Sequence, residues 1–106
     1  MQILIVNFEL VDRDFDAYKA QCEQIAKAFA AVPGLIAKHW LANGDTNTYG
    51  GVYVFEDEAS LKGYLASDLF GTLSQIPNFT NVSVKSFGTI ETAGAITGGA
   101  IFAKAA

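Results

Sequence analysis

The sequence predicts a single α+β domain in which a four-stranded antiparallel sheet carries its helices on one face. Three observations predict it. The 106 residues suffice for one hydrophobic core. Hydrophobic residues make up 51% of the chain and charged residues 17%, which excludes a disordered chain. Strand and helix patterns alternate in the order strand, helix, strand, strand, helix, strand, which is the ferredoxin-like βαββαβ arrangement.

The chain begins with a strand and a helix. Residues 2–8 are β-branched and apolar on both faces, which predicts a strand that is covered on both sides. Asp12 or Asp14 then supplies a helix cap, and Val32-Pro33-Gly34 ends the helix. Between them, apolar residues recur at three- and four-residue steps, as on one face of an amphipathic helix: Phe15, Tyr18, Cys22, Ile25 and Phe29.

A hairpin and a second helical region follow. Residues 35–41 and 49–55 read as two strands joined by a polar turn. Asp57 is placed to cap a helix, and a second short helical segment is expected to begin at Ser67. Residues 80–87 then alternate as a fourth strand. The two strands, the helical region and the fourth strand complete the βαββαβ order.

The composition of the last residues predicts a domain boundary, and the apolar strand faces predict a partner subunit. We expect residues 1–89 to form the domain, and residues 90–106, rich in Ala and Gly, to be a tail or an arm that packs on a dimer. Because the strands are apolar on both faces and the helices cover one, the other face would be an unusually large apolar patch on a monomer. The sequence therefore predicts a homodimer packed sheet to sheet.

Composition and absent motifs exclude several classes of function. The net charge of −4 disfavours nucleic acid as a partner. A single cysteine and a single histidine exclude a disulfide framework and the common metal clusters, so we expect no metal. No apolar run reaches the ~20 residues of a membrane span, and the first residues lack the pattern of a signal peptide. We expect a cytoplasmic protein without membrane or nucleic-acid partners, and no nucleotide fingerprint is present.

Polar and aromatic residues within the strands are the candidates for chemistry. Strand alternation places Lys38 and Trp40 on one face and His39 on the other, and leaves open which face lines a cavity. Each of these residues also has a structural reading, Trp40 as a core aromatic and Lys38 as a rim residue. The candidates for catalysis are Asn7, His39, Trp40 and Tyr53, and the candidates for substrate binding are Lys38, Gly50, Gly51 and Phe55.

Two motifs around the hairpin carry a family resemblance. Residues 33–40 read PGLIAKHW, and residues 50–58 read GGVYVFEDE. This order of Pro-Gly, Lys-x-Trp and Gly-Gly-Val-Tyr-Val-Phe resembles the YdhR-like family of monooxygenases. The resemblance covers nearly the whole chain and weakens after about residue 88.

The resemblance implies a dimeric α+β barrel of the antibiotic-biosynthesis-monooxygenase type, with a cavity between sheet and helices in each subunit. Related members oxidise polycyclic phenols to quinones with oxygen and without metal or flavin, so no cofactor is implied. Haem-degrading relatives need a histidine on a helix, whereas His39 is on an expected strand. Asn7 matches the family by strand position, and five residues match by motif: Lys38, Trp40, Gly50, Gly51 and Tyr53.

Two functional hypotheses remain at this point. The first is a cofactor-independent monooxygenase acting on a small aromatic or polycyclic phenol. Asn7 would donate a hydrogen bond and Trp40 would stack on the substrate, while Tyr53 would donate to a substrate oxygen. His39 would be the base, or Lys38 would supply positive charge if it faces inward. The second hypothesis is a non-catalytic dimer that binds a small aromatic or apolar ligand, since such a pocket serves binding equally well. An isomerase or cyclase on the same barrel is a third interpretation.

Overall fold

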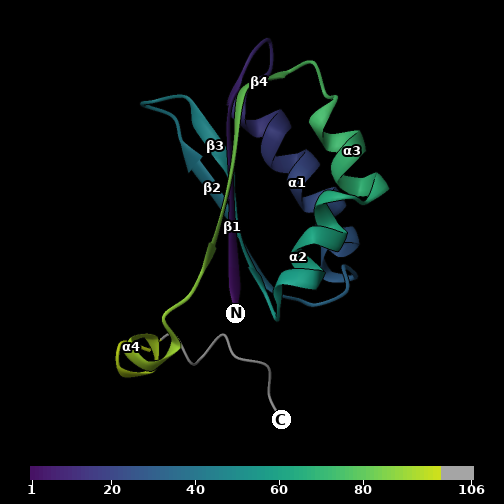
Figure 1. The fold of residues 1–106 in the computed structure, drawn as a ribbon. Coiled ribbons are helices and arrows are strands. Elements are labelled where there is room, and N and C mark those ends of the chain that lie inside the picture. Colours follow the sequence, from purple (N-terminus) through teal and green to yellow (C-terminus); the bar gives the residue numbers. More distant parts are fainter. Residues whose placement is uncertain (99–106) are drawn as a thin grey trace.

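The computed structural model describes residues 1–98, which form one sheet and four helices (Figure 1). The elements are β1 (Gln2–Leu10), α1 (Phe15–Ala30), β2 (Leu35–Asn43), β3 (Thr48–Phe55), α2 (Glu58–Leu65), α3 (Asp68–Ser74), β4 (Phe79–Gly88) and α4 (Glu91–Ile96). The strand order is β2-β3-β1-β4 and every neighbouring pair is antiparallel. The predicted ferredoxin-like fold class is confirmed.

The helices α1, α2 and α3 lie on one face of the sheet (Figure 1). Along β1, alternate residues turn toward them, and Leu4, Val6, Phe8 and Leu10 are all buried. The first strand continues two residues beyond the expected end at Phe8, because Leu10 extends the alternation and pairs with a residue of β4. This buried row forms the floor of the space between sheet and helices.

The helix starts follow the expected capping chemistry. Of the two candidate caps for α1, Asp14 takes the position, and its carboxylate accepts a hydrogen bond of 2.8 Å from the Ala17 N–H. Asp12 instead lies before the helix with a positive φ of 56°. The Asp57 carboxylate and the Ser67 hydroxyl cap α2 and α3 in the same way. Each of these three helices therefore begins at a residue whose side chain accepts a hydrogen bond from the first turn.

The end of the chain holds a short helix, α4, within the segment that we expected to be irregular. The N-terminal ammonium group contacts the Glu91 carboxylate of this helix. Residues 99–106, the rest of the expected tail or arm, lie outside the described residues, and the domain boundary at residue 89 stays a prediction. No helix within residues 1–98 is long and apolar enough to cross a membrane. The expected cytoplasmic location stays a prediction.

Candidate active site

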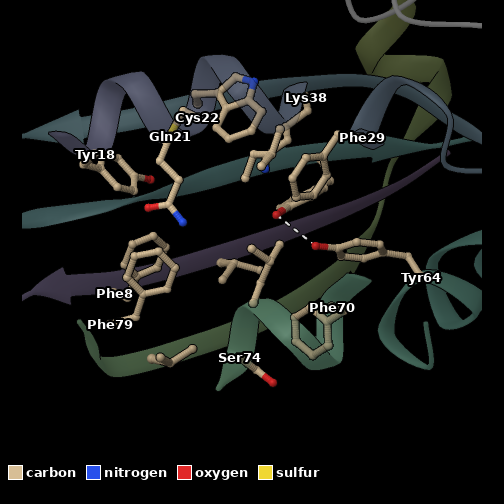
Figure 2. A pocket seen from close by; sticks show the side chains of 17 residues that line it. Phe8, Tyr18, Gln21, Cys22, Phe29, Lys38, Tyr64, Phe70, Ser74 and Phe79 are labelled. Carbon is tan, nitrogen blue, oxygen red and sulfur yellow. Dashed lines mark hydrogen bonds between the residues drawn. The ribbon is translucent and has the colours of Figure 1, made fainter. Parts of the chain in front are cut away.

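A pocket lies between the sheet and the helices, with a cavity volume of about 60 Å³ (Figure 2). Its walls come from β1, β2, β3 and β4 on one side and from α1, α2 and α3 on the other. Aromatic and aliphatic side chains make up most of its lining: Val6, Phe8, Tyr18, Cys22, Ile25, Phe29, Trp40, Tyr53, Tyr64, Phe70, Leu73, Phe79 and Val82. A site of this composition binds an apolar or aromatic ligand and holds few polar groups.

Strand register explains why one basic residue points into this apolar pocket. Lys38 pairs across the hairpin with Tyr53, so both side chains lie on the helix-facing side of the sheet. Trp40, two residues further along β2, lies on the same side. The sequence prediction that Lys38 and Trp40 share a face is confirmed, and that face lines the pocket.

The Lys38 amine lies among three aromatic rings. Its Nζ atom is 3.3 Å from the ring centroid of Phe29, 3.5 Å from that of Trp40 and 4.6 Å from that of Tyr53. Within residues 1–98, Lys38 Nζ forms no ion pair and no hydrogen bond. Attraction to the ring faces is therefore the main interaction available to its ammonium form.

Burial changes the acid–base chemistry of Lys38. Desolvation lowers the pKa of its amine from 10.5 to about 7, and the nearby Cys22 thiol acts weakly in the opposite direction. The three ring faces also favour the ammonium form and so oppose desolvation. Lys38 is thus placed to exchange a proton near neutral pH, which is the range in which a general base is most effective.

Two tyrosine hydroxyls form a second polar feature of the pocket. The Tyr64 hydroxyl donates a hydrogen bond of 3.2 Å to the Tyr53 oxygen (Figure 2). Burial raises the pKa of both phenols, so both are neutral at physiological pH. Because Tyr53 accepts from Tyr64, its own proton remains available to donate to a ligand oxygen.

Gln21 brings an amide to the pocket wall, and a network outside the pocket holds it. Arg13 donates to the Gln21 side-chain oxygen, and also donates a hydrogen bond of 3.0 Å to the Asn78 side chain. The oxygen of Gln21 is thereby engaged, which leaves its NH₂ group to face the pocket. Figure 2 shows the Gln21 amide pointing between Tyr18 and Phe8.

Two glycines on β3 occupy positions where a larger residue would not fit. A Cβ atom on Gly51 would lie 2.8 Å from Lys38 Cε and 3.2 Å from a ring carbon of Tyr53. Gly50 has a positive φ of 145°, and a Cβ atom there would lie 1.8 Å from the Val6 carbonyl oxygen. Gly51 therefore leaves space for Lys38, and Gly50 permits close approach of β1 and β3.

Some of the residues expected at the site line the pocket, and others do not. The pocket lining includes Lys38, Trp40, Gly50 and Tyr53, whereas Gly51 lies beneath the Lys38 side chain. Phe55 is fully buried in the core, with its ring stacked on Tyr53 and tilted against Tyr64, and does not line the pocket.

The remaining two candidates, Asn7 and His39, do not line the pocket. Asn7 alternates with the buried residues of β1, and His39 pairs with Val52, so both belong to the opposite face of the sheet. The sequence analysis did not select three pocket residues of the helices, Gln21, Phe29 and Tyr64. Within residues 1–98 there is no group of three or more His, Cys, Asp or Glu residues that could hold a metal ion.

These features define a ferredoxin-like α+β protein with a ring-lined pocket between its sheet and helices. Residues 3–100 match the family described as "Putative mono-oxygenase ydhR", and the chain belongs to this family. The resemblance expected from the hairpin motifs is therefore confirmed. None of the curated proteins is similar enough in sequence to count as a relative.

Solved structures share the fold at low sequence identity. MhuD, a heme-degrader from Mycobacterium tuberculosis seen with two hemes bound in its active site, is 15% identical, with 85% of this chain and 96% of that chain covered and a TM-score of 0.68. SnoaB, a cofactor-independent oxygenase from Streptomyces nogalater, is 20% identical over 84% of this chain and 93% of that chain, with a TM-score of 0.65. A "putative antibiotic biosynthesis monooxygenase" from Deinococcus radiodurans is 12% identical over 84% and 92%, with a TM-score of 0.67.

Proposed function

We propose that the protein is a cofactor-independent monooxygenase that oxidises a small aromatic or polycyclic phenol with molecular oxygen. The observation that supports this most directly is the Lys38 amine, held among three aromatic rings in an otherwise apolar pocket. A phenol is the ligand that suits both features, because its ring packs on Trp40 while its hydroxyl group reaches a base. Membership of a monooxygenase family agrees with the proposal.

The proposed reaction uses Lys38 as a base. The neutral amine takes the phenolic proton, and the resulting ammonium stabilises the phenolate in a site that excludes water. The Tyr53 hydroxyl donates to the same or a neighbouring substrate oxygen. The electron-rich anion passes one electron to O₂, and the two radicals combine at carbon to give a peroxide anion. This anion takes back the proton from the Lys38 ammonium, and the resulting hydroperoxide loses water to give a carbonyl group. One oxygen atom enters the product and the other leaves as water, so no further reductant is needed.

The substrate must displace a side chain to enter. A cavity of about 60 Å³ is smaller than the roughly 150 Å³ that accommodates a benzene ring. A second hollow of about 270 Å³ lies between α1 and β2, and Phe29, Lys38 and Trp40 line both spaces. We propose that the flexible Lys38 side chain moves so that the two spaces join, which provides room for one or more rings.

We also propose that the protein acts as a homodimer through the sheet face opposite the helices. Ile3 and Ile5 of β1 point to this face, and Phe87 pairs with Ile3, so its ring is on the same side. Phe87 is 49% exposed and adjoins the two isoleucines, so this face presents several neighbouring apolar side chains. A second copy packed on this face would cover these side chains and form the barrel that the sequence predicts.

Oxygen uptake tests the proposed activity. Protein treated with a chelator is mixed with anthrones, dihydroxynaphthalenes and related phenols, and a Trp40→Ala variant and a Lys38→Met variant are compared with it. We expect uptake by the chelator-treated protein, and a loss of at least about tenfold in each variant. A Lys62→Met variant is the control, because Lys62 is an exposed residue of α2 paired with Glu58.

Two results would count against the proposal. Uptake that disappears with the chelator would assign the reaction to a metal. Tight binding of a phenol without any uptake would instead identify a ligand-binding protein, or an isomerase or cyclase that needs no oxygen.

A further inference from the structure

We propose that Lys38 is also a nucleophilic amine, which condenses with an aromatic or conjugated aldehyde or ketone to form an imine in this pocket. This would be an activity separate from oxygenation. It needs neither O₂ nor a phenol, so it does not rest on the function proposed above. Three features of the Lys38 amine support this activity: its position, the groups that surround it and its access from two cavities.

Within residues 1–98 no carboxylate pairs with the Lys38 amine, and the aromatic ring faces are the main groups that favour its ammonium form. The titratable groups that line the pocket with it are Cys22 and Tyr18 of α1, Tyr53 of β3 and Tyr64 of α2. Burial raises the pKa of each, so none carries a negative charge at neutral pH. The desolvated amine is therefore neutral in a substantial fraction of molecules near pH 7. A neutral amine has the lone pair that an attack on a carbonyl carbon requires.

The position of the amine suits a flat carbonyl compound. Lys38 Nζ lies 3.3 Å from the Phe29 centroid and 3.5 Å from the Trp40 centroid, so a conjugated ring bound at this point would pack on these faces. The same three side chains line both the inner pocket and the hollow between α1 and β2. A carbonyl compound in either space would meet the amine.

The proposed step is a condensation without any change of oxidation state. The Lys38 nitrogen forms a bond to the carbonyl carbon, and a proton moves from nitrogen to oxygen to give a carbinolamine. The carbon–oxygen bond then breaks, the oxygen leaves as water with a second proton from nitrogen, and a carbon–nitrogen double bond remains. The Tyr53 hydroxyl lies on the same wall and is placed to donate a hydrogen bond to the carbonyl oxygen and then to the departing one.

Trapping with a reductant tests the proposal on the unmodified chain. The protein is incubated at pH 7 with 2-naphthaldehyde and sodium cyanoborohydride, and labelled lysines are located by peptide mass mapping. We expect one dominant adduct on Lys38, formed at least about tenfold faster than on Lys62, whose pKa is raised by Glu58. The labelling rate of Lys38 should reach half its maximum near pH 7, whereas that of Lys62 should still rise above pH 9.

Variants separate a specific site from general lysine reactivity. Lys38→Met should abolish the dominant adduct, and Lys62→Met should leave it unchanged. Equal labelling of all lysines, or an unlabelled Lys38 in the folded wild-type protein, would overturn the proposal. Neither readout depends on oxygen, so failure of the imine does not alter the oxygen-uptake test, and the reverse also holds.

Discussion

Replacing Lys38 by methionine should make the protein more stable at neutral pH and should flatten the pH dependence of its stability. Methionine is unbranched like the lysine stem, fits the space above Gly51, and packs favourably on aromatic rings. It has sulfur in place of the Cδ methylene group and ends at Cε, so the amine is removed and the length of the stem is kept. The experiment therefore isolates the free energy of placing an ionisable nitrogen among Phe29, Trp40 and Tyr53.

The magnitude follows from the pKa of Lys38, which is 10.5 for an ordinary lysine and about 7 in the folded protein. The unfolded chain binds more protons than the folded one between these values, so wild-type stability rises as the pH increases from about 7 to 10.5. The full difference between the two pKa values corresponds to a free energy of about 5 kcal/mol, at 1.36 kcal/mol per pKa unit. Between pH 6 and pH 9 the linkage relation gives about 2–3 kcal/mol. The stability advantage of the variant should shrink by that amount over this range.

Urea unfolding followed by far-ultraviolet circular dichroism at a series of pH values measures the effect. Taking the difference between wild type and variant removes the contribution of titrating groups that do not interact with Lys38, and leaves only that of Lys38 and of the Cys22 thiol beside it. Lys62→Met is the matched control, because Lys62 is exposed, Glu58 raises its pKa and Lys62 lowers that of Glu58, so its effect on stability should stay constant between pH 6 and pH 9. If the wild-type and Lys38→Met curves run parallel from pH 6 to pH 9, the amine is not desolvated and the reasoning about its reactivity fails.

Three further predictions concern the pocket, the sheet and the open face. Tyr64→Phe should lower the free energy of unfolding by about 1 kcal/mol in thermal denaturation, because Tyr53 loses its hydrogen-bond donor; an unchanged melting temperature would contradict it. Gly50→Ala should cost about 3 kcal/mol or prevent folding, since the new Cβ atom meets the Val6 carbonyl oxygen at a positive φ; a wild-type urea midpoint would count against this. Phe87→Asp should shift a dimer to monomers in sedimentation without changing the circular dichroism spectrum, and a monomeric wild type would refute the proposed dimer.

The fold could be predicted closely because local signals and tertiary packing agree in this chain. The cap expected at Asp57 is used, the second helical segment starts at Ser67 as expected, and the stop at Pro33-Gly34 separates α1 from β2. The helix α4 was missed because its Ala- and Gly-rich sequence has no apolar periodicity and no side-chain cap. Its start beside the N-terminal ammonium is a contact between the two ends of the domain, which no local pattern encodes.

The site could be predicted only in part, because β1 and β3 are apolar on both faces. Alternation groups Lys38 with Trp40 but does not show which face the helices cover. Asn7 and His39 were therefore expected at a pocket whose lining they do not join. On α1, Phe29 belongs to the apolar stripe and Gln21 lies at its edge. In the sequence, neither position differs from that of an ordinary core residue. Only the three-dimensional arrangement shows that this stripe leaves a cavity.

At Lys38, the residue that is present differs from the apolar one that its surroundings favour. This mismatch is the strongest argument for a functional site. Local pattern, strand pairing and core packing all suit an apolar side chain there, and methionine would remove a cost of several kcal/mol. The fold nevertheless accommodates the amine through Gly51, which leaves room for its stem, and through rings that attract its charged form. Sites that break a local rule while the surroundings compensate for it are where function is expected. An amine in this position is suited to accept a proton or to attack a carbonyl carbon.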